Sequence, residues 1–529
     1  MPRTAMNDRK SNSFTLLVSL VVALGGFLMG FDSAVISGVV DPVREQFGLE
    51  ASEIGWAVAC LTLGATLAMA VAGPLADRFG RRTILLWTAL VFPVSAGASA
   101  RATSYQMLVW ARIIGGLGVG GALLIAPIYI AELAPPERRG RLVSFNQLNI
   151  VLGFSAAFFS NYFLNKSLEG TEEAWRWMLG VEAIPAAAYF FLLLLVPRSP
   201  RWLAATGRND EALTVLARAV GESRAGAALT EVQYSVAAAA QHGKPQAREL
   251  LAPRMRRVMV IGLGLGFFQQ ITGINAIFYY STTIFGMTGA SRDVALEQAI
   301  WVGIVNVVFT LIAMRLIDRL GRRPLLILGT SVMTLALLTN AWAFSTAEYR
   351  IGEPGAQATE VLGDGFAPEL AAALQPLGGV AHDGEPVFLA AARDAASSAG
   401  LDVATVFTPR AQDLAKASLH LDGTLVLIAI LAYIAAFAIS LGPVMWAMFS
   451  EIFPLRVRGL AISAAGFFNS FVSFGVQQVF PLGLDTLGPG LVFLVFGVFA
   501  ALALLFSLFV IPETKGRTLE ELESELIGS

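Results

Sequence analysis

Residues 77–82 read DRFGRR, and residues 318–323 read DRLGRR. A second repeated segment follows each copy, ELAPPERRG from Glu132 and EIFPLRVRG from Glu451. Two motifs that recur in the same order indicate that one half of the chain is a diverged copy of the other. We therefore expect a fold built from two similar halves.

The composition places both halves in a lipid bilayer. Of the 529 residues, 55% are hydrophobic and only 14% are charged, whereas a soluble domain carries about a quarter charged residues. The mean hydropathy is +0.65. A bilayer-spanning helix needs roughly 20 apolar residues, and twelve runs of about that length occur, at roughly 14–40, 53–76, 83–100, 105–130, 143–164, 177–197, 257–285, 297–317, 324–344, 423–447, 460–481 and 489–511. The expected fold is an all-α membrane protein of twelve transmembrane helices in two pseudo-symmetric six-helix halves.

Charge and residue counts exclude several function classes. The formal net charge of -2 gives no indication of a nucleic-acid partner. Three histidines and one cysteine, Cys60, leave too few ligands for a metal cluster and no partner for a disulfide. No nucleophile and base, and no metal site, can be assembled within the spans, so we expect neither an enzyme nor a cofactor or metal.

The positive charges indicate the orientation of the chain. Arginines follow the even-numbered spans, while the odd-numbered loops carry almost none. Cytoplasmic loops retain positive charge, so both termini are expected in the cytoplasm of a multi-pass cell-membrane protein. The expected parts are an N-terminal half (1–197), a charged cytoplasmic helical linker (198–256), a C-terminal half (257–511) and a cytoplasmic tail (512–529).

The spacing of the repeats indicates an insertion in the second half. The DRxGRR copies are 241 residues apart (77 to 318), and the glutamate-led copies are 319 apart (132 to 451), so about 78 extra residues separate the second pair. The polar stretch at about 345–422 accounts for them and lies outside the cell in the expected topology. A disordered or loosely helical loop is the favoured interpretation, and a small binding or capping subdomain is the alternative.

Acids and bases at repeated positions predict ion pairs that clamp the cytoplasmic ends of the helices. Rocking of the halves would then require this clamp to break and form again. The alternative is that the arginines only set the orientation, but that explains neither the acids nor the doubled spacing. The clamp residues are Asp77, Arg78, Arg81, Glu132 and Arg139 in the first half, and Asp318, Arg319, Arg322, Glu451 and Arg458 in the second.

Six segments in order resemble the sugar porter family of the major facilitator superfamily, most closely its bacterial xylose-proton symporter and glucose facilitator branches. They read GFDSAVISG (30–38), GPLADRFGRR (73–82), YIAELAPPERRG (129–140), PRSPRWL (197–203), FFQQITGINAIFYY (267–280) and PETKG (512–516). The resemblance covers nearly the whole chain except the insertion. It implies transport by alternating access, with no chemical turnover.

A carboxylate within a span is costly and usually functional, often in a proton relay, and Asp32 lies within the first span. The resemblance makes Asp32 the proton carrier and Arg112, in WARIIGG, its basic partner. Separation of the pair would let Asp32 take up a proton. The alternative places both residues near helix ends, in contact with water. Uniporter-like relatives tend to have an uncharged residue at this position, so Asp32 favours proton coupling.

The resemblance also implies a sugar site of amides and one tryptophan, side chains that can donate, accept and stack. Hydrogen bonding between packed helices is the alternative role for any single amide. Gly442 and Pro443 could break the helix beside the site and form a gate. The implied sugar-site residues are Gln147, Gln269, Gln270, Asn275, Asn306, Trp446, Asn469, Phe278 and Gly442.

Four positions depart from the family pattern. Ser470 stands where relatives often carry a second tryptophan, Phe154 where the xylose branch has an amide, and Phe278 where that branch has an aliphatic residue. The two aromatics resemble the hexose-handling relatives, which favours glucose or a similar hexose over xylose. Arg198 replaces an acid and is expected to weaken the clamp of the first half.

The resulting hypothesis is a monomeric symporter whose partners are a sugar, a proton and the lipid bilayer. A facilitative sugar uniporter, a polyol (inositol) carrier and a transport-dead sugar sensor are the alternatives.

Overall fold

The computed structural model describes residues 3–135, 138–169, 171, 173–241, 246–352, 358, 362, 366–454 and 456–527. Within these ranges, 11 helices are long and apolar enough to cross a membrane. The longest, α24 (Arg458–Phe509), is non-helical at Gly488, whose φ of 76° lies in the left-handed region, and Pro489 follows. The 52 residues of α24 therefore form two spans joined by a kink, which agrees with the expected twelve.

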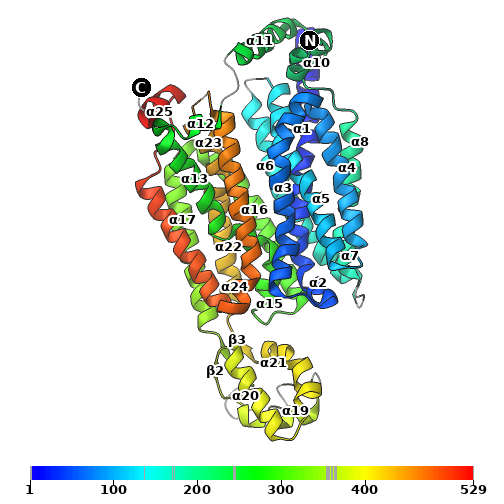
Figure 1. Ribbon diagram of the computed structural model, residues 1–529, viewed down its shortest axis with the longest axis vertical. Coiled ribbons are helices and arrows are strands. Elements are labelled where there is room, and N and C mark those ends of the chain that lie inside the picture. The colour runs from blue at the N-terminus through cyan, green and yellow to red at the C-terminus, as the bar shows by residue number, and fades with distance from the viewer. Residues whose placement is uncertain are drawn as a thin grey trace.

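The two halves stand side by side as two helix bundles (Figure 1). The first consists of α1 (Arg3–Val35), η1 (Ile36–Gly38), α2 (Val40–Phe47), α3 (Ala51–Phe79), α4 (Arg81–Ala100), α5 (Tyr105–Leu133), α6 (Arg139–Ser167), α7 (Ala174–Gly180) and α8 (Ala183–Leu193). The second consists of α13 (Arg256–Ile271), α14 (Ile274–Tyr279), α15 (Ser281–Gly286), α16 (Arg292–Leu320), α17 (Arg322–Ser345), α22 (Gly423–Ile439), α23 (Leu441–Ile452) and α24.

Short helices outside the bundles mark one end of the molecule, which we call the linker end (Figure 1). They are α9 (Pro200–Ala205), α10 (Asn209–Val220), α11 (Glu222–Gln241), α12 (Ala247–Leu250), η3 (Pro253–Met255) and α25 (Leu519–Ile527). The hydroxyls of Ser11 and Thr15 both donate to the carbonyl of Ala219, at 2.5 and 3.0 Å, and so tie α1 to α10.

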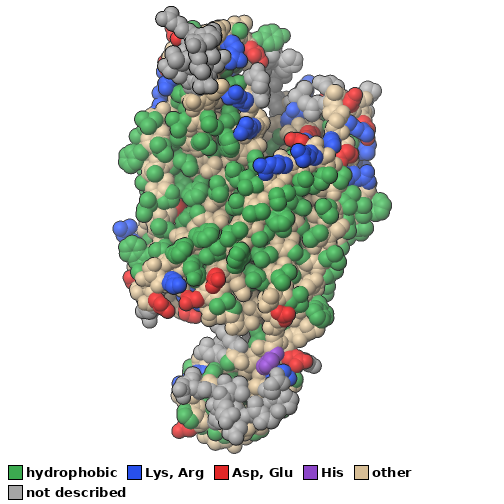
Figure 2. Space-filling view, turned by 180° about the vertical axis from the view of Figure 1, so that it is seen from behind, with side chains coloured by type: hydrophobic (Ala, Val, Ile, Leu, Met, Phe, Trp, Pro, Cys, Tyr) green, Lys and Arg blue, Asp and Glu red, His purple; other side chains and the backbone are tan. Residues whose placement is uncertain are grey.

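The outer surface of the bundles matches a membrane environment. Figure 2 shows hydrophobic side chains covering the middle of the bundles, while lysines and arginines gather toward the linker end. Large apolar side chains of the spans, such as Trp87, Trp110 and Leu195, are exposed on the surface. Such an extensive apolar surface would be unfavourable in water.

The residues between α17 and α22 fold at the opposite end, which we call the insert end (Figure 1). Three short strands form one antiparallel sheet with β1 in the centre, and Ile351, Leu370, Phe388 and Leu414 belong to a buried apolar cluster separate from those of the bundles. The elements of this insert are β1 (Glu348–Tyr349), α19 (Pro368–Ala373), η5 (Gln375–Leu377), β2 (His382–Asp383), α20 (Glu385–Ser398), η6 (Val403–Phe407), η7 (Thr408–Arg410), α21 (Ala411–Ser418) and β3 (Leu419–His420).

The preference for a disordered or loosely helical insert is therefore wrong for the described residues, because a sheet and a buried cluster organise them. The alternative of a subdomain is correct in fold. The insert does not cover the bundles as a cap. In Figure 1 it projects from the C-terminal half beyond α17 and α22.

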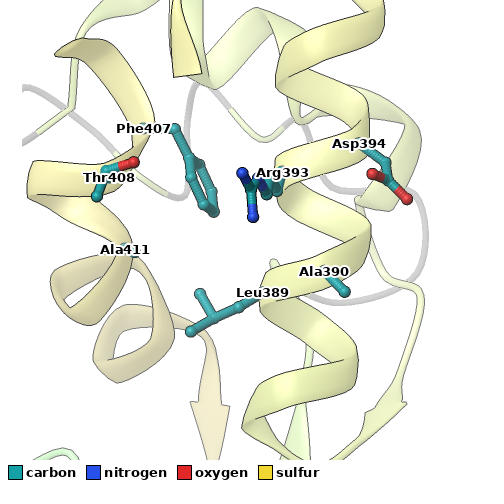
Figure 3. Close-up of a pocket in the computed structure, with 7 residues that line it drawn as sticks. All are labelled: Leu389, Ala390, Arg393, Asp394, Phe407, Thr408 and Ala411. Carbon is teal, nitrogen blue, oxygen red and sulfur yellow. The ribbon is translucent and has the colours of Figure 1, made fainter. Parts of the chain in front are cut away.

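The insert contains a cavity of about 650 Å³ between α20 and the segment η6 to α21 (Figure 3). Leu389, Phe407 and Arg393 point into it, while Asp394 points away. The remaining lining residues are Ala390, Thr408 and Ala411. All of these residues belong to the insert, so the cavity is separate from the polar groups of the bundles.

Candidate functional site

Asp32 on α1 and Arg112 on α5 meet in the interior of the N-terminal half. Arg112 Nη1 lies 3.5 Å from Asp32 Oδ1, and the two residues are 2% and 5% exposed. The alternative that they sit in water near helix ends is thus wrong. A buried ion pair is costly to desolvate, so its presence within a membrane span indicates function.

The neighbours of the pair fix its geometry. Arg112 Nε donates to the carbonyl of Ala57 at 3.1 Å, while Nη2 makes no hydrogen bond within the described part of the chain. Gly115 lies one turn beyond Arg112, where a Cβ would come 3.0 Å from Asp32 Oδ2 and 2.5 Å from Ser95 Oγ. A side chain at position 115 would therefore clash with the Ser95 hydroxyl and crowd the Asp32 carboxylate.

Glu182 is a second buried carboxylate near this pair, and the sequence analysis missed it. It lies between α7 and α8, is 3% exposed, and its Oε1 has no hydrogen-bond partner among the described residues. Its charge interacts with those of Asp32 and Arg112. The sequence could have pointed to Glu182, because it is an acidic residue within the expected span 177–197.

Four of the expected amides form one hydrogen-bonded cluster in the C-terminal half. Asn469 Nδ2 donates to Gln269 Oε1 at 2.8 Å, and Gln270 Nε2 donates to Asn469 Oδ1 at 3.3 Å. Asn275 Nδ2 donates to Gln270 Oε1 at 2.9 Å. The cluster joins α13, α14 and α24, so it brings together residues almost 200 positions apart.

Ser473 and Gln477 extend this amide cluster along α24 and were not predicted. Asn275 Nδ2 donates to Ser473 Oγ at 2.7 Å, and Gln477 Nε2 donates to the same oxygen at 2.8 Å. Residues 469, 473 and 477 are four apart and share one helix face. Polar residues at this spacing on an otherwise apolar helix could have revealed Ser473 and Gln477 from the sequence.

Helix breaks position the cluster. Gln269 Nε2 donates to the carbonyls of Leu441 and Gly442, at 3.1 and 3.5 Å, where α22 has ended and α23 begins. The break falls at Ser440, because the ring of Pro443 cannot fit beside the carbonyl of residue 439 in a continuous helix. Gly273, with a φ of 93°, interrupts the helix between α13 and α14.

The other expected sugar-site residues lie outside the amide cluster. Gln147 on α6 and Asn306 on α16 make no hydrogen bond to it within the described residues, although Asn306 is buried. Trp446 is 42% exposed and packs edge-on against Phe449. Phe278 contacts Phe154 with ring centroids 4.8 Å apart, so the two departures from the family pattern meet across the halves.

The clamp residues pair within each half. Arg81 lies 3.0 Å from Asp77 and 3.1 Å from Glu132, and Arg322 lies 2.7 Å from Glu451 and 3.8 Å from Asp318. Arg78 and Arg319 are exposed and Arg458 donates to the carbonyl of Phe453, so these three form no ion pair with the clamp acids in the described structure. The side chain of Arg139 lies outside the described residues. No clamp bond among those described joins one half to the other.

The two clamps are nearly symmetric and differ at one position. Ser199 Oγ donates to Glu132 Oε2, and Thr514 Oγ1 donates to Glu451 Oε2, both at 2.5 Å. In the C-terminal half, the Glu513 carboxylate also accepts from the backbone N–H groups of Arg322 and Arg323 at 3.1 Å. The equivalent residue of the N-terminal half is Arg198, which lies over the ring of Trp202 instead.

Comparisons with known proteins assign the family. The model of the family described as "Sugar (and other) transporter" matches residues 18–356 and 397–526. The chain belongs to this sugar transporter family. The match leaves out 357–396, which lies inside the insert.

Similar proteins cover almost the full chain. The arabinose-proton symporter of Bacillus subtilis is 33% identical over 99% of this chain and 97% of its own length. The D-xylose-proton symporter of Escherichia coli is 33% identical over 98% of this chain and 97% of its own. A partially occluded inward-open structure of the xylose transporter XylE from E. coli has a TM-score of 0.73 at 31% identity, and covers 96% of this chain and 100% of that one. The fold is thus the twelve-helix fold of the major facilitator superfamily.

Proposed function

We propose that this protein is a proton-coupled sugar symporter that works by alternating access. The observation that carries the proposal is the buried pair of Asp32 and Arg112, 3.5 Å apart within a membrane-spanning bundle. A facilitator has no need of a buried carboxylate, whereas a symporter needs a group that can bind and release a proton. Relatives named arabinose-proton and xylose-proton symporters support the same function.

The pair supplies the coupling. Arg112 favours the ionised form of Asp32 through its opposite charge, and this acts against burial, which favours the neutral form. When the helices move apart the carboxylate loses this partner in an apolar interior, and protonation removes the cost of the unpaired charge. Glu182 is a second buried carboxylate whose charge interacts with those of Asp32 and Arg112, so we assign it to the same proton relay.

The sugar is proposed to bind to the amide cluster of the C-terminal half. Gln269, Gln270, Asn275 and Asn469 exchange hydrogen bonds with one another, and hydroxyl groups can replace these bonds one for one. Trp446 offers a partly exposed ring for the C–H face of a sugar. Phe154 and Phe278, which contact each other, stand where the xylose branch carries an amide and an aliphatic residue, and this resemblance to hexose-handling relatives favours a hexose.

The orientation follows from the charges. Lysines and arginines gather toward the linker end (Figure 2), so this end is proposed to face the cytoplasm and the insert to face outward. Each half has its own amide or charge cluster, and no second chain is needed to complete either. We therefore propose a monomer in the cell membrane.

The test is transport by purified protein in proteoliposomes. Counterflow of labelled hexoses, pentoses and inositol identifies the substrate, and an imposed pH gradient should then drive its accumulation. Asp32→Asn should abolish accumulation and retain exchange, since it removes only the proton-binding group. Accumulation by Asp32→Asn would contradict the coupling role, and wild-type exchange without proton-driven accumulation would establish a uniporter.

A further inference from the structure

The cavity of the insert lies in a part of the chain that the family model leaves partly unmatched. The unmatched range, 357–396, includes most of α20, which forms one wall of the cavity (Figure 3). The volume of about 650 Å³ falls within the range of roughly 300 to 1,000 Å³ that is typical of sites for small organic ligands. No step of the transport proposed above uses this cavity.

The wall formed by α20 is held in place by the apolar cluster of the insert. Phe388, Ala392 and Ala396 recur every four residues and are all 0% exposed. Leu389 and Arg393 each follow one of these positions directly, so they form an adjacent strip along the helix. Both point into the cavity in Figure 3. Packing of the buried strip therefore fixes the direction in which Arg393 faces.

The opposite wall contains an unusual backbone segment. The residues of η6, Val403–Phe407, form a π-helix. Such turns are rare and occur frequently at functional sites. Phe407 ends the π-helix, is 5% exposed, and directs its ring into the cavity (Figure 3). The π-helix thus places an aromatic ring across the cavity from α20.

Arg393 is the group of this cavity that can recognise a polar ligand. It makes no ion pair and no hydrogen bond among the described residues, and its neighbour Asp394 points away from the cavity (Figure 3). The hydroxyl of Thr408 already donates to the carbonyl of Val403 at 2.9 Å. The guanidinium is therefore the side-chain donor that remains available in the lining.

The lining selects a class of ligand. A guanidinium can donate to both oxygens of a carboxylate at once, and Leu389 and Phe407 suit an apolar body. A neutral sugar needs several donors and acceptors, which this lining does not offer. Residues 345–422 contain 11 Asp and Glu but only 4 Lys and Arg, so an anion with several charges would be repelled.

We propose that the insert binds a small monocarboxylate with an aliphatic or aromatic body. Arg393 holds the carboxylate, while Leu389 and Phe407 pack against the body of the ligand. This accessory site is separate from the amide cluster and from the pair of Asp32 and Arg112, so the inference does not rest on the proposed transport function.

The test is equilibrium dialysis of the full chain in nanodiscs, with empty nanodiscs subtracted. The probes are radiolabelled hexanoate and 3-phenylpropionate, each compared with its neutral amide. At least one carboxylate should bind saturably at one site per chain. Its amide should bind about tenfold more weakly or worse, because it lacks the charge that Arg393 recognises.

Two variants of the lining locate the bound probe. Arg393→Gln should weaken binding about tenfold or more, since it removes the charged fork. Ala390→Trp should also weaken it, because Ala390 is an exposed lining residue and the larger ring would fill the cavity. The matched control is Arg410→Gln, which removes an arginine of η7 that is not in the lining, and should leave binding within about twofold.

Hydrogen exchange measured by mass spectrometry on peptides of the insert checks that each variant is folded. If Arg393→Gln loses protection there, Ala390→Trp decides. The absence of saturable binding for both carboxylates in the low millimolar range would overturn the proposal. Equal binding of acid and amide, or unchanged binding in a folded Arg393→Gln protein, would overturn it as well. Loss of counterflow would count against the transport function alone.

Discussion

At the scale of single residues, the coupling pair depends on a glycine that no charge argument would select. Gly115→Ala places a methyl group 3.0 Å from Asp32 Oδ2 and 2.5 Å from Ser95 Oγ. Overpacking of this kind costs about 1 to 3 kcal/mol in a packed interior. We expect proton-driven accumulation to fall, since the methyl group displaces the Ser95 hydroxyl and crowds the Asp32 carboxylate.

The control for this substitution lies one turn along the same helix. Gly118→Ala meets no atom closer than 3.4 Å, so it should leave accumulation nearly unchanged. Removal of the Ser95 hydroxyl should partly rescue Gly115→Ala, because it clears the nearest contact. Equal losses in both alanine variants, measured as pH-driven uptake, would show a general defect of α5 and not a local displacement.

The amide cluster makes its own residue-scale prediction. Gln270→Ala and Asn275→Ala should each weaken sugar binding by about 1 to 3 kcal/mol, the cost of leaving buried partners unpaired. Asn340→Ala is the control, because that buried amide donates to a carbonyl of its own helix, α17. Titration calorimetry with the substrate found by counterflow measures all three. Unchanged isotherms for Gln270→Ala and Asn275→Ala would remove both residues from the site.

The sequence predicted the residues of these two sites better than their partners. Asp32 is conspicuous because a carboxylate in an apolar span is rare, whereas Arg112 and the four clustered amides were implied by the resemblance to the sugar porter family. Glu182 and Ser473 lie within spans just as Asp32 does, but only tertiary packing shows that their side chains turn toward the same groups. Gly115 could not be selected, since its role is the space that it leaves.

At the scale of helices, each clamp joins helices of one half, and the two clamps differ at the position of Glu513 and Arg198. Glu513 caps the start of α17 with two hydrogen bonds to backbone N–H groups, while Arg198 offers the start of α4 no acceptor. Arg198→Glu should therefore stabilise the protein by about 0.5 to 2 kcal/mol, the usual contribution of a helix N-cap. Thermal unfolding in detergent measures it.

Two variants separate capping from charge at this position. Arg198→Gln removes the positive charge without supplying a carboxylate, so it should give less stabilisation than Arg198→Glu. Glu513→Gln should destabilise the opposite half by a similar amount. A lower unfolding temperature for Arg198→Glu would contradict the symmetric assignment of the two positions.

The sequence predicted where the membrane-spanning helices lie, but it predicted only some of the breaks within them. Apolar length alone placed the spans, and Pro443 indicated a break that the structure places three residues earlier, at Ser440. The break between α7 and α8 lies between Gly180 and Pro185, so the sequence carried a signal for it. The break between α14 and α15, at Tyr280, carries no proline or glycine and depends on packing against other helices, which a single sequence does not display.

At the scale of the whole molecule, the insert is a separately folded unit at one end of the transporter. Its buried cluster is its own, and the family model omits 357–396. Joining Phe344 to Gly423 through a short flexible linker should preserve expression, proton coupling and the sugar dissociation constant. Loop-closure entropy changes slowly with length, so docking of α17 against α22 should persist.

Counterflow and sugar binding measure the effect of the deletion. The amide-cluster variant Gln270→Ala serves as the reference, because it is expected to lose affinity. A tenfold change in the dissociation constant, about 1.4 kcal/mol, would show that the insert contributes to the site. Its fold could not be predicted from sequence, because its short strands and helices give no long periodic pattern.

The paired strands at the base of the insert have a practical consequence. Glu348 pairs with His420 and Tyr349 with Leu419, so the chain leaves and re-enters the bundle at one point. This junction is therefore a suitable site for fusing another folded domain. A rigid foreign module with adjacent ends could replace the insert between β1 and β3 without parting α17 from α22. That would give electron microscopists a fixed landmark outside the micelle, on a transporter whose mass otherwise lies largely within it.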